Sequence, residues 1–548
     1  MSLTYKSLKK ILLILLISCL VFMTACSPLE RVIEFFSDDG TGYIFKISLF
    51  SDPEILDPQI ASDESSIAIL ENMFVGLLKQ DSDGTIKTAG AEDYTISADG
   101  LSYTFYLDSR YTWKTVGDWE GSITAYDYEF AFRRLFSAET GSPYASDYFS
   151  ILNSEAAFKG EVELTEIGVH ATDDYTLVIT LEYPNAEFLS LLTRLPASPC
   201  NEEFFESCKG KYGLEAECIA SNGPFYVRYW LHEEYSTDNY VRLRRNDYYC
   251  EFCDVYPYGV NYLIEKDEAV RLSDFTDGTT DVYISSTFEA KLEGTDYQSY
   301  SVYFCGLVIN PENEILSRTE VAEIISMAID REALESETPD ILTVAYGIIP
   351  PDAYVGSSNY RKSVGSSYED ILVYNEQLAE YKWSFTLTDS EKLMLYGIKI
   401  MVPDTFEYTD YLKIVTESLN DTLGIGIGID IVNESDYASR LARGDYDICL
   451  VEIESSSGSA LDYIEAFSDG TYGISNESCL EAVESSGKYS TLSAAIYAIS
   501  EAEKDIITSY QCLPLWYAEK FVFTADDVSG LEYDVFSGAA IFELVKKL

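Results

Sequence analysis

Histidine is almost missing from this chain of 548 residues, which contains only His170 and His232. A zinc site draws on several histidines or cysteines at ligand spacing, and neither histidine has such a partner. No GxSxG elbow of a serine hydrolase is present. The 93 acidic residues leave room for the paired carboxylates of a glycoside hydrolase, but no spacing singles out a pair. We therefore expect no metal site, no cofactor and no enzyme chemistry.

Basic residues are also scarce, with 37 lysines and arginines against the 93 acids and a formal net charge of −56. A field of this sign repels nucleic acid and anionic lipid, so nucleic acid is not expected as a partner. Two interpretations of the charge stay open. The charge keeps an exported protein soluble, or it attracts cationic solutes, in which case added salt should slow their capture.

Cysteines are numerous but form no readable disulfide framework. Of the eleven, Cys19 lies in the signal peptide and Cys26 at the lipidation site, both described below, and the remaining nine leave at least one free thiol in a monomer. Cys250 and Cys253 form a CxxC without the second pair that zinc needs. One disulfide is possible within a cluster of three, whose pairing the sequence does not define: Cys200, Cys208 and Cys218.

No apolar run reaches the ~20 residues that a helix needs to cross a bilayer. The longest run covers residues 11–25 and follows three lysines among the first ten residues. A cationic head before a short apolar run is typical of a secretory signal peptide. We therefore assign residues 1–25 to a signal peptide, which places the mature protein outside the cytoplasm.

The end of that run, Met23-Thr24-Ala25-Cys26, resembles the lipobox of bacterial lipoproteins. In such signals the cysteine is diacylated after the preceding peptide is removed, and two acyl chains hold a protein stably at a membrane. The residue three positions before the cysteine is usually leucine in such signals, and Met23 departs from this pattern. The resemblance implies a lipid on Cys26 and a lipid-anchored tether over residues 26–41. The alternative is an ordinary signal cleaved near Ala25, which leaves Cys26 as a plain thiol.

The mature chain predicts an α/β protein of two or three lobes, because roughly 520 residues exceed the size of a single core. Alternating apolar residues indicate strands at 43–49, 103–107 and 177–181. Apolar residues at helical spacing predict a helix over 67–78. The glycines of 424–428 lack the spacing of a dinucleotide-binding loop, and we interpret them as part of a strand.

Two capping boxes mark helix starts. Thr124 is followed three residues later by Asp127, and Ser317 by Glu320, each ahead of an apolar stripe. Trp113 stands near an expected turn, and we assign it to the core and not to a ligand platform.

Eight short blocks resemble, in family order, the bacterial oligopeptide- and dipeptide-binding lipoproteins, solute-binding family 5 of ABC importers. Each block is weak alone, and their shared order over about 500 residues carries the resemblance. The blocks are DPEILDP at 52–58, FVGLL at 74–78, SADGLSYTF at 97–105, TAYD at 124–127, DDYTL at 173–177, NGPFY at 222–226, AIDRE at 328–332 and LPLWY at 513–517.

The resemblance implies a two-lobed clamp of the periplasmic-binding-protein type II class, with an extra domain inserted in the first lobe. Lobe one is implied at 42–85, 218–303 and 513–548, the extra domain at 86–217, and lobe two at 304–512. A monomer of this kind holds a peptide or peptide-like solute between its lobes. The membrane permease subunits of an ABC importer then recognise the closed state.

The resemblance also implies where the ligand lies. In peptide-binding relatives two extended segments flank the ligand main chain, which is recognition by strand addition. The implied ligand-binding residues are Asp52, Pro53 and Glu54 in one segment and Glu452, Ile453, Glu454, Ser455 and Ser456 in the other. For Asp52 and Glu54 a structural role, as acids before a turn or cap, remains open.

One position departs from the family. Peptide-binding relatives carry an aspartate that ion-pairs with the peptide's α-amine, and its position here falls on Ser456. Serine brings no charge, and charge-assisted hydrogen bonds are roughly twice as strong as neutral ones. Either Glu452 or Glu454 takes over this role, or the natural ligand has no free α-amine.

Three alternatives to peptide import remain. A surface sensor uses the same clamp to report peptides, and an oligosaccharide-binding importer subunit uses it for another solute. Genes for importer subunits beside this one would favour transport over sensing. A surface hydrolase, the third, would have to cleave oligosaccharides or peptides.

Overall fold

The computed structural model describes residues 42–548 except 234–235, 237, 340, 366–367 and 456. The assigned signal peptide, the tether with Cys26, and Ser456 lie outside the described residues. Phe45–Leu548 form one compact unit, which contains nearly all of the described chain. Within the described part of the chain, no helix is both long and apolar enough to cross a membrane.

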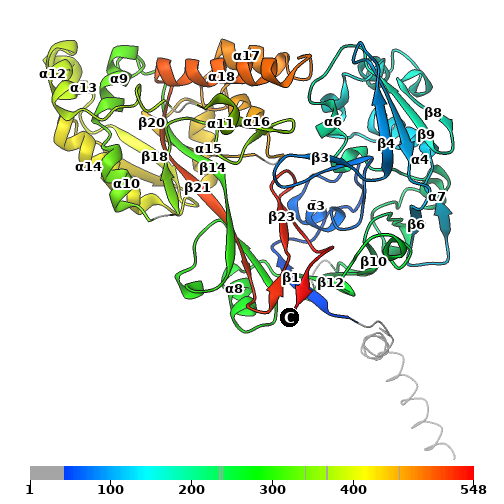
Figure 1. The fold of residues 1–548 in the computed structure, drawn as a ribbon. Helices are drawn as coiled ribbons and strands as arrows, with labels where there is room; N and C mark the ends of the chain where they lie inside the picture. Colours follow the sequence, from blue (N-terminus) through cyan, green and yellow to red (C-terminus); the bar gives the residue numbers. More distant parts are fainter. Residues whose placement is uncertain (1–41, 234–235, 237, 340, 366–367, 456) are drawn as a thin grey trace, which may run out of the picture. The chain divides into compact units, whose positions relative to one another are not determined.

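An eleven-stranded mixed sheet runs through this unit. Two 13-residue strands, β14 (Tyr297–Ile309) and β21 (Cys512–Thr524), pair antiparallel near its middle and are the long green and red strands of Figure 1. The strand order is β10-β11-β12-β1-β13-β21-β14-β20-β18-β19, with β15 paired to β21. The other strands are β1 (Ile44–Leu49), β10 (Phe225–Leu231), β11 (Tyr240–Arg245), β12 (Gly259–Ile264), β13 (Val282–Ser285), β15 (Leu342–Val344), β18 (Lys399–Pro403), β19 (Gly428–Val432) and β20 (Ile448–Glu454).

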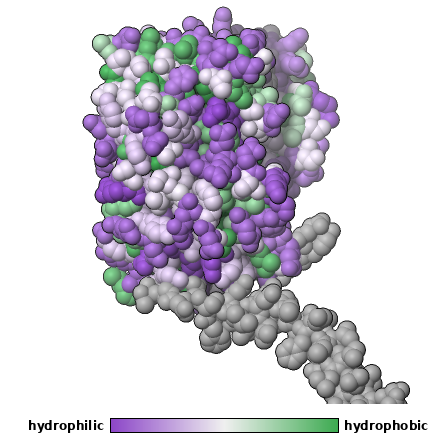
Figure 2. All heavy atoms as spheres, turned by 90° about the vertical axis from the view of Figure 1, so that its right-hand side faces the viewer, coloured by the Kyte–Doolittle hydropathy of each residue, from purple (hydrophilic) through white to green (hydrophobic). Residues whose placement is uncertain are grey.

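A four-stranded antiparallel sheet forms the core of residues 91–207, from β4 to α7, which we call the inserted part. Its order is β4-β5-β9-β8, and α4 packs against β8 and β9. The face over this part is mostly hydrophilic in Figure 2. The elements are β4 (Ala91–Ile96), β5 (Ser102–Leu107), β6 (Thr112–Lys114), β7 (Glu120–Ser122), β8 (Val169–Asp173), β9 (Thr176–Thr180), α4 (Ala125–Leu135), α5 (Ser154–Phe158), α6 (Phe188–Leu191) and α7 (Glu202–Ser207).

Helices cover the β18–β20 half of the large sheet, and short strand pairs fill the loops. The helices there are α9 (Thr319–Ala328), α10 (Arg331–Glu337), α11 (Tyr360–Val364), α12 (Glu376–Thr386), α13 (Asp389–Met394), α14 (Leu412–Leu423), α15 (Glu434–Ala442), α16 (Ala460–Glu465), α17 (Glu477–Glu484) and α18 (Leu492–Ser509). The remaining elements are α3 (Glu64–Leu70), α8 (Glu268–Thr276), β2 (Leu78–Gln80), β3 (Ile86–Thr88), β16 (Tyr354–Val355), β17 (Ser358–Asn359), β22 (Val528–Ser529), β23 (Glu532–Asp534), β24 (Ala539–Ile541) and β25 (Lys546–Lys547).

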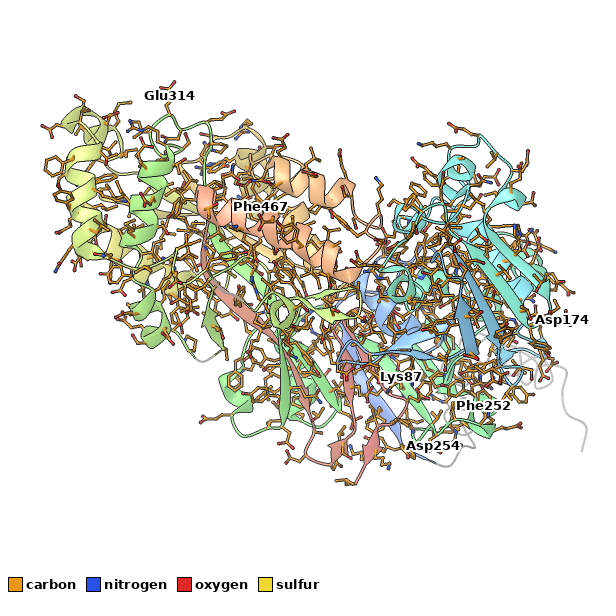
Figure 3. The ribbon with its side chains drawn as sticks, turned by 45° about the horizontal axis from the view of Figure 1, so that its top comes forward. Lys87, Asp174, Phe252, Asp254, Glu314 and Phe467 are labelled. Atoms are coloured by element: carbon orange, nitrogen blue, oxygen red, sulfur yellow. The ribbon has the colours of Figure 1, made fainter. Side chains whose placement is uncertain are left out.

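The buried apolar side chains gather in separate clusters on the two sides of β14 and β21. One cluster joins the core of the inserted sheet to that of β1 and β10–β12. Two further clusters lie on opposite faces of the β14–β20 half. Phe467 is fully buried in one of them, whereas Glu314 and Asp174 stand at the periphery in Figure 3. This division matches a fold with two halves joined by long strands.

The strands expected from alternation are confirmed. β1, β5 and β9 alternate between buried and more exposed residues, as half-buried strands do. The capping box at Thr124 is also confirmed, since the Asp127 carboxylate accepts a hydrogen bond of 2.7 Å from the Thr124 N–H. Trp113 is fully buried in the core.

The helix expected over 67–78 is wrong in its second half, because α3 ends at Leu70 and Leu78 begins β2. Asn222 explains the early end. Its side-chain oxygen accepts from the Val75 N–H at 2.9 Å and its amide donates to the Val75 carbonyl at 2.7 Å. These contacts replace the intrahelical bonds that a continued helix would make, so apolar residues at helical spacing are buried on irregular backbone.

Two other local predictions need correction. Helix α9 begins after Arg318, which makes no side-chain cap, so Ser317 is not its N-cap. Asn313 is the reason: its side chain accepts from the Leu316 N–H at 3.1 Å and holds a separate turn that ends at the helix. Gly424 is the left-handed C-cap of α14 at φ 65°, and β19 begins only at Gly428.

No disulfide forms among the nine cysteines that the structure describes. Burial raises the pKa of both Cys200 and Cys208 to about 12, so these thiols stay protonated at neutral pH. The bridge considered within this cluster is therefore not made here.

Candidate functional site

A cavity of about 870 Å³ opens between the inserted part and the β20 half of the unit. This volume falls in the ~300–1,000 Å³ range of small-molecule sites. Its walls come from α3, from the loops at 144–149 and 183–196, from residues 454–465 after β20, from the end of α17, and from the tail around β23. Segments far apart in the sequence thus enclose one space.

The last residue of β20, Glu454, lines this cavity, and the end of this strand has one open edge. β20 pairs with β14 along its whole length, but with β18 only at Ile448 and Cys449. Among the described strands, residues 451–454 therefore have a partner on one side only. Unpaired strand N–H and C=O groups are a ready template for another extended chain.

Glu454 lies at the boundary between this cavity and a smaller one of about 260 Å³. Its carboxylate accepts from Lys520 Nζ at 2.9 Å, and the same ammonium lies 3.3 Å from Glu64. Lys520 belongs to β21, so it links α3 to β20. Because Glu454 already has a cationic partner, it is a weaker candidate for binding a ligand amine.

Asp462, in the first turn of α16, presents a different carboxylate. The Ser455 and Ser457 hydroxyls both donate to its Oδ2, at 2.6 and 2.9 Å. Its other oxygen, Oδ1, accepts no hydrogen bond from the described residues, and Asp462 lines the cavity. Two neutral donors thus orient a carboxylate that has no cationic partner within the described chain.

Nothing in the sequence alone singles out Asp462. Its position depends on the loop after β20 folding back so that Ser455 and Ser457 meet the start of α16. The serine-rich stretch around Ser456 indicates such a contact in the sequence, since short hydroxyl side chains commonly form hydrogen bonds with nearby acids and backbone groups in loops.

Glu452 lies two residues before Glu454 on β20. Its side chain is exposed, yet desolvation by the surrounding protein raises its pKa to about 7, with Glu454 and Glu407 contributing. A carboxyl group with this pKa is only partly charged at neutral pH. Neither Glu452 nor Ile453 lines the larger cavity.

None of the three residues of the first expected ligand segment lines either cavity. Asp52 accepts from Asn239 at 2.8 Å and lies 4.0 Å from Lys266, and Pro53 is buried. The Glu54 N–H donates to Asp63, which caps α3. The structure therefore does not bring Asp52, Pro53 and Glu54 together with the β20 segment around one cavity.

No cluster of three or more histidine, cysteine or acidic side chains suited to a metal ion occurs within the described residues. What the fold and the cavity define is a binding protein: a large enclosed space, an open strand edge and an oriented carboxylate. Such an arrangement holds a solute.

The sequence profile of bacterial extracellular solute-binding proteins, family 5, matches residues 85–474. The chain therefore belongs to that family, whose members are extracytoplasmic solute-binding proteins. The two-lobed α/β clamp expected from the sequence is confirmed.

Curated relatives match over most of their length. The chain is 22% identical over 496 residues to the dipeptide-binding protein DppE of Bacillus subtilis, covering 88% of each chain. It is 23% identical over 436 residues to the oligopeptide-binding protein OppA of the same organism, covering 78% of each.

Solved structures share the fold. The substrate-binding domain of an oligopeptide ABC transporter from Bacillus anthracis superposes with a TM-score of 0.66 at 23% identity, over 93% of this chain and 99% of that one. OppA of Listeria monocytogenes bound to peptide gives a TM-score of 0.67 at 20% identity, over 93% and 99%.

Proposed function

We propose that this protein is the substrate-binding lipoprotein of an ABC importer and that it captures peptides between its two lobes. The observation that carries the proposal is the 870 Å³ cavity, which is lined by Asp462 and by Glu454, the last residue of the open β20 edge. This combination suits a peptide, because its main chain can hydrogen-bond to an open strand edge and its α-amine can bind a carboxylate. Membrane permease subunits of the importer would recognise the closed clamp.

Within this proposal, residues 451–454 bind the ligand main chain and Asp462 binds the α-amine in place of the uncharged Ser456. The clamp favours its closed state because a bound peptide contacts both walls of the cavity at once. Ser455 contributes by orienting Asp462. Glu454, paired with Lys520, shapes the cavity and leaves amine recognition to Asp462.

Ligand identity is the direct test of this function. We expect small peptides among the molecules that co-purify with the protein, detected by mass spectrometry after denaturation. Peptides added at a hundredfold excess over their dissociation constant should stabilise the protein by about 2.7 kcal/mol, visible as a rise in Tm. If oligosaccharides raise the Tm and peptides do not, the peptide assignment is wrong.

The membrane anchor is tested separately, at Cys26. We expect Cys26→Ser to abolish incorporation of a labelled fatty acid and to move the protein from the membrane to the soluble fraction, because the acyl chains supply the membrane affinity. Cys479→Ser, at a cysteine buried in the folded unit, is the control and should stay on the membrane. Persistent labelling of the Cys26→Ser protein would overturn the anchor assignment.

A further inference from the structure

The walls of the large cavity are strongly acidic. The described lining residues include nine carboxylates and only two cationic side chains, Arg194 and Lys488. Arg194 lies 3.4 Å from Asp147, and Lys488 donates to the backbone carbonyl of Glu484 at 2.6 Å. Most of the carboxylates therefore face the cavity without an ion-pair partner among the described residues.

Two of these acids form a subsite at one end. Asp534, in β23, accepts from the Phe536 N–H at 2.9 Å and from the Ser537 hydroxyl at 2.8 Å, and Ser537 also lies within hydrogen-bond reach of Glu71 at the end of α3. A hydroxyl has one proton to donate, so it cannot satisfy both carboxylates. Burial, and then their proximity to each other, raises the pKa of Glu71. No ion pair involves either carboxylate within the described residues.

Acids also face one another across the cavity. Burial raises the pKa of Asp147, from the inserted part. The nearby Arg194 partly offsets this shift, and Asp462, from the β20 half, adds to it. Burial likewise raises the pKa of Glu465, and the nearby Asp462, Asp469 and Asp147 add to the shift. Like charges on opposite walls repel when the cavity is empty, and a cation placed between them turns that repulsion into attraction.

We propose that the cavity selects cationic peptides, and that Glu71 and Asp534 bind a lysine or arginine side chain of the cargo. This inference rests on the proposed function and adds the chemical class of the substrate. An ammonium brings three hydrogen-bond donors and a guanidinium five. The Glu71 and Asp534 carboxylates share the single hydroxyl proton of Ser537, so such a side chain supplies further donors that this group lacks. The charge of the solute thereby contributes to closure as well as to affinity.

The net negative charge of the whole chain also favours cationic solutes, but it does not by itself explain selective binding in the cavity. A formal net charge of −56 raises the encounter rate of any cation, and salt screens this effect. Carboxylates enclosed in a cavity act at short range in a poorly screened environment, so they change affinity as well as rate. A test must therefore separate local from long-range charge.

The experiment measures Kd by calorimetry for matched tetrapeptides: tetra-alanine and the same peptide with one lysine or one glutamate at each position. At low salt we expect the best lysine peptide to bind roughly tenfold more tightly than tetra-alanine and the glutamate peptides at least tenfold more weakly. Glu71→Gln and Asp534→Asn should each reduce the lysine preference to about threefold or less. Glu139→Gln, which removes the same charge at an exposed turn, should keep the preference.

Each outcome decides between the proposals. Equal binding of alanine and lysine peptides overturns the charge inference and leaves peptide capture standing. Binding of spermidine but of no peptide overturns peptide capture and supports the acidic subsite. Binding of neither overturns both. A lysine preference that Glu139→Gln reduces as much as Glu71→Gln does would assign the effect to the long-range field, against the subsite.

Discussion

Replacing Glu503 by alanine is expected to lower the free energy of unfolding by about 3–5 kcal/mol, the cost of leaving a buried ionic partner uncompensated. The Glu503 side chain is fully buried and pairs with Arg361. It also accepts hydrogen bonds from the Ile348 and Ile349 N–H groups, at 2.8 and 3.0 Å, and from the Tyr360 hydroxyl at 2.8 Å. Removing this one carboxylate therefore strands several buried donors at once.

Urea denaturation followed by circular dichroism measures the change. Glu501→Ala is the matched control, because Glu501 lies on the same helix, α18, and forms an exposed pair with Lys504 at 3.4 Å. Exposed pairs of this kind contribute about 0.2–1 kcal/mol. A double-mutant cycle with Arg361→Ala isolates the coupling between the two charges. Similar losses for Glu501→Ala and Glu503→Ala would show that the buried network does not stabilise the fold.

The sequence predicts local structure well where one physical signal dominates. Alternation identified β1 and β5 because each buries one face and exposes the other. The spacing of Thr124 and Asp127 identified the start of α4 because both partners of that cap lie within one turn. Signals of this range need no knowledge of the rest of the chain.

Prediction failed where a distant side chain decides the local structure. The early end of α3 depends on Asn222, which is 147 positions from Val75. Likewise Glu454 is committed to Lys520, 66 residues further on. Neither pairing leaves a periodic pattern or a short spacing in the sequence. The sequence therefore predicted Glu454 to be a free acid, although it is paired with Lys520.

The candidate site shows the same limit. Family resemblance located the β20 segment near the cavity, and the open edge of residues 451–454 agrees with a strand-addition role. It could not show that Asp52 and Glu54 line neither cavity, because their contacts with Asn239 and Asp63 depend on how separate segments pack. The oriented Asp462 emerged only once the loop geometry was known.

Asp462→Asn is expected to weaken binding of peptides with a free α-amine by about 2–3 kcal/mol, or roughly 30–150-fold in Kd, because a partly buried amine loses its charged acceptor. Asparagine keeps the size of the side chain and can still accept from Ser455 and Ser457, so the loop should keep its shape. Calorimetry with one peptide in free and N-acetylated forms measures the effect. The acetylated form should bind weakly to the wild type and no more weakly to the variant.

Two further variants make the assignment of the amine site specific. Asp469 is an exposed acid shortly after α16, and its carboxylate accepts from the Thr471 N–H at 2.8 Å. Asp469→Asn removes its charge and should leave the Kd unchanged. Glu454→Gln tests the rival acid. If Glu454→Gln, and not Asp462→Asn, selectively weakens the free-amine peptide, the amine binds at Glu454, and Lys520 must turn away from it on ligand binding. Equal losses for free and acetylated peptides in Asp462→Asn would instead reduce Asp462 to a loop-shaping role, and the carboxylate's open Oδ1 would have no part in recognition.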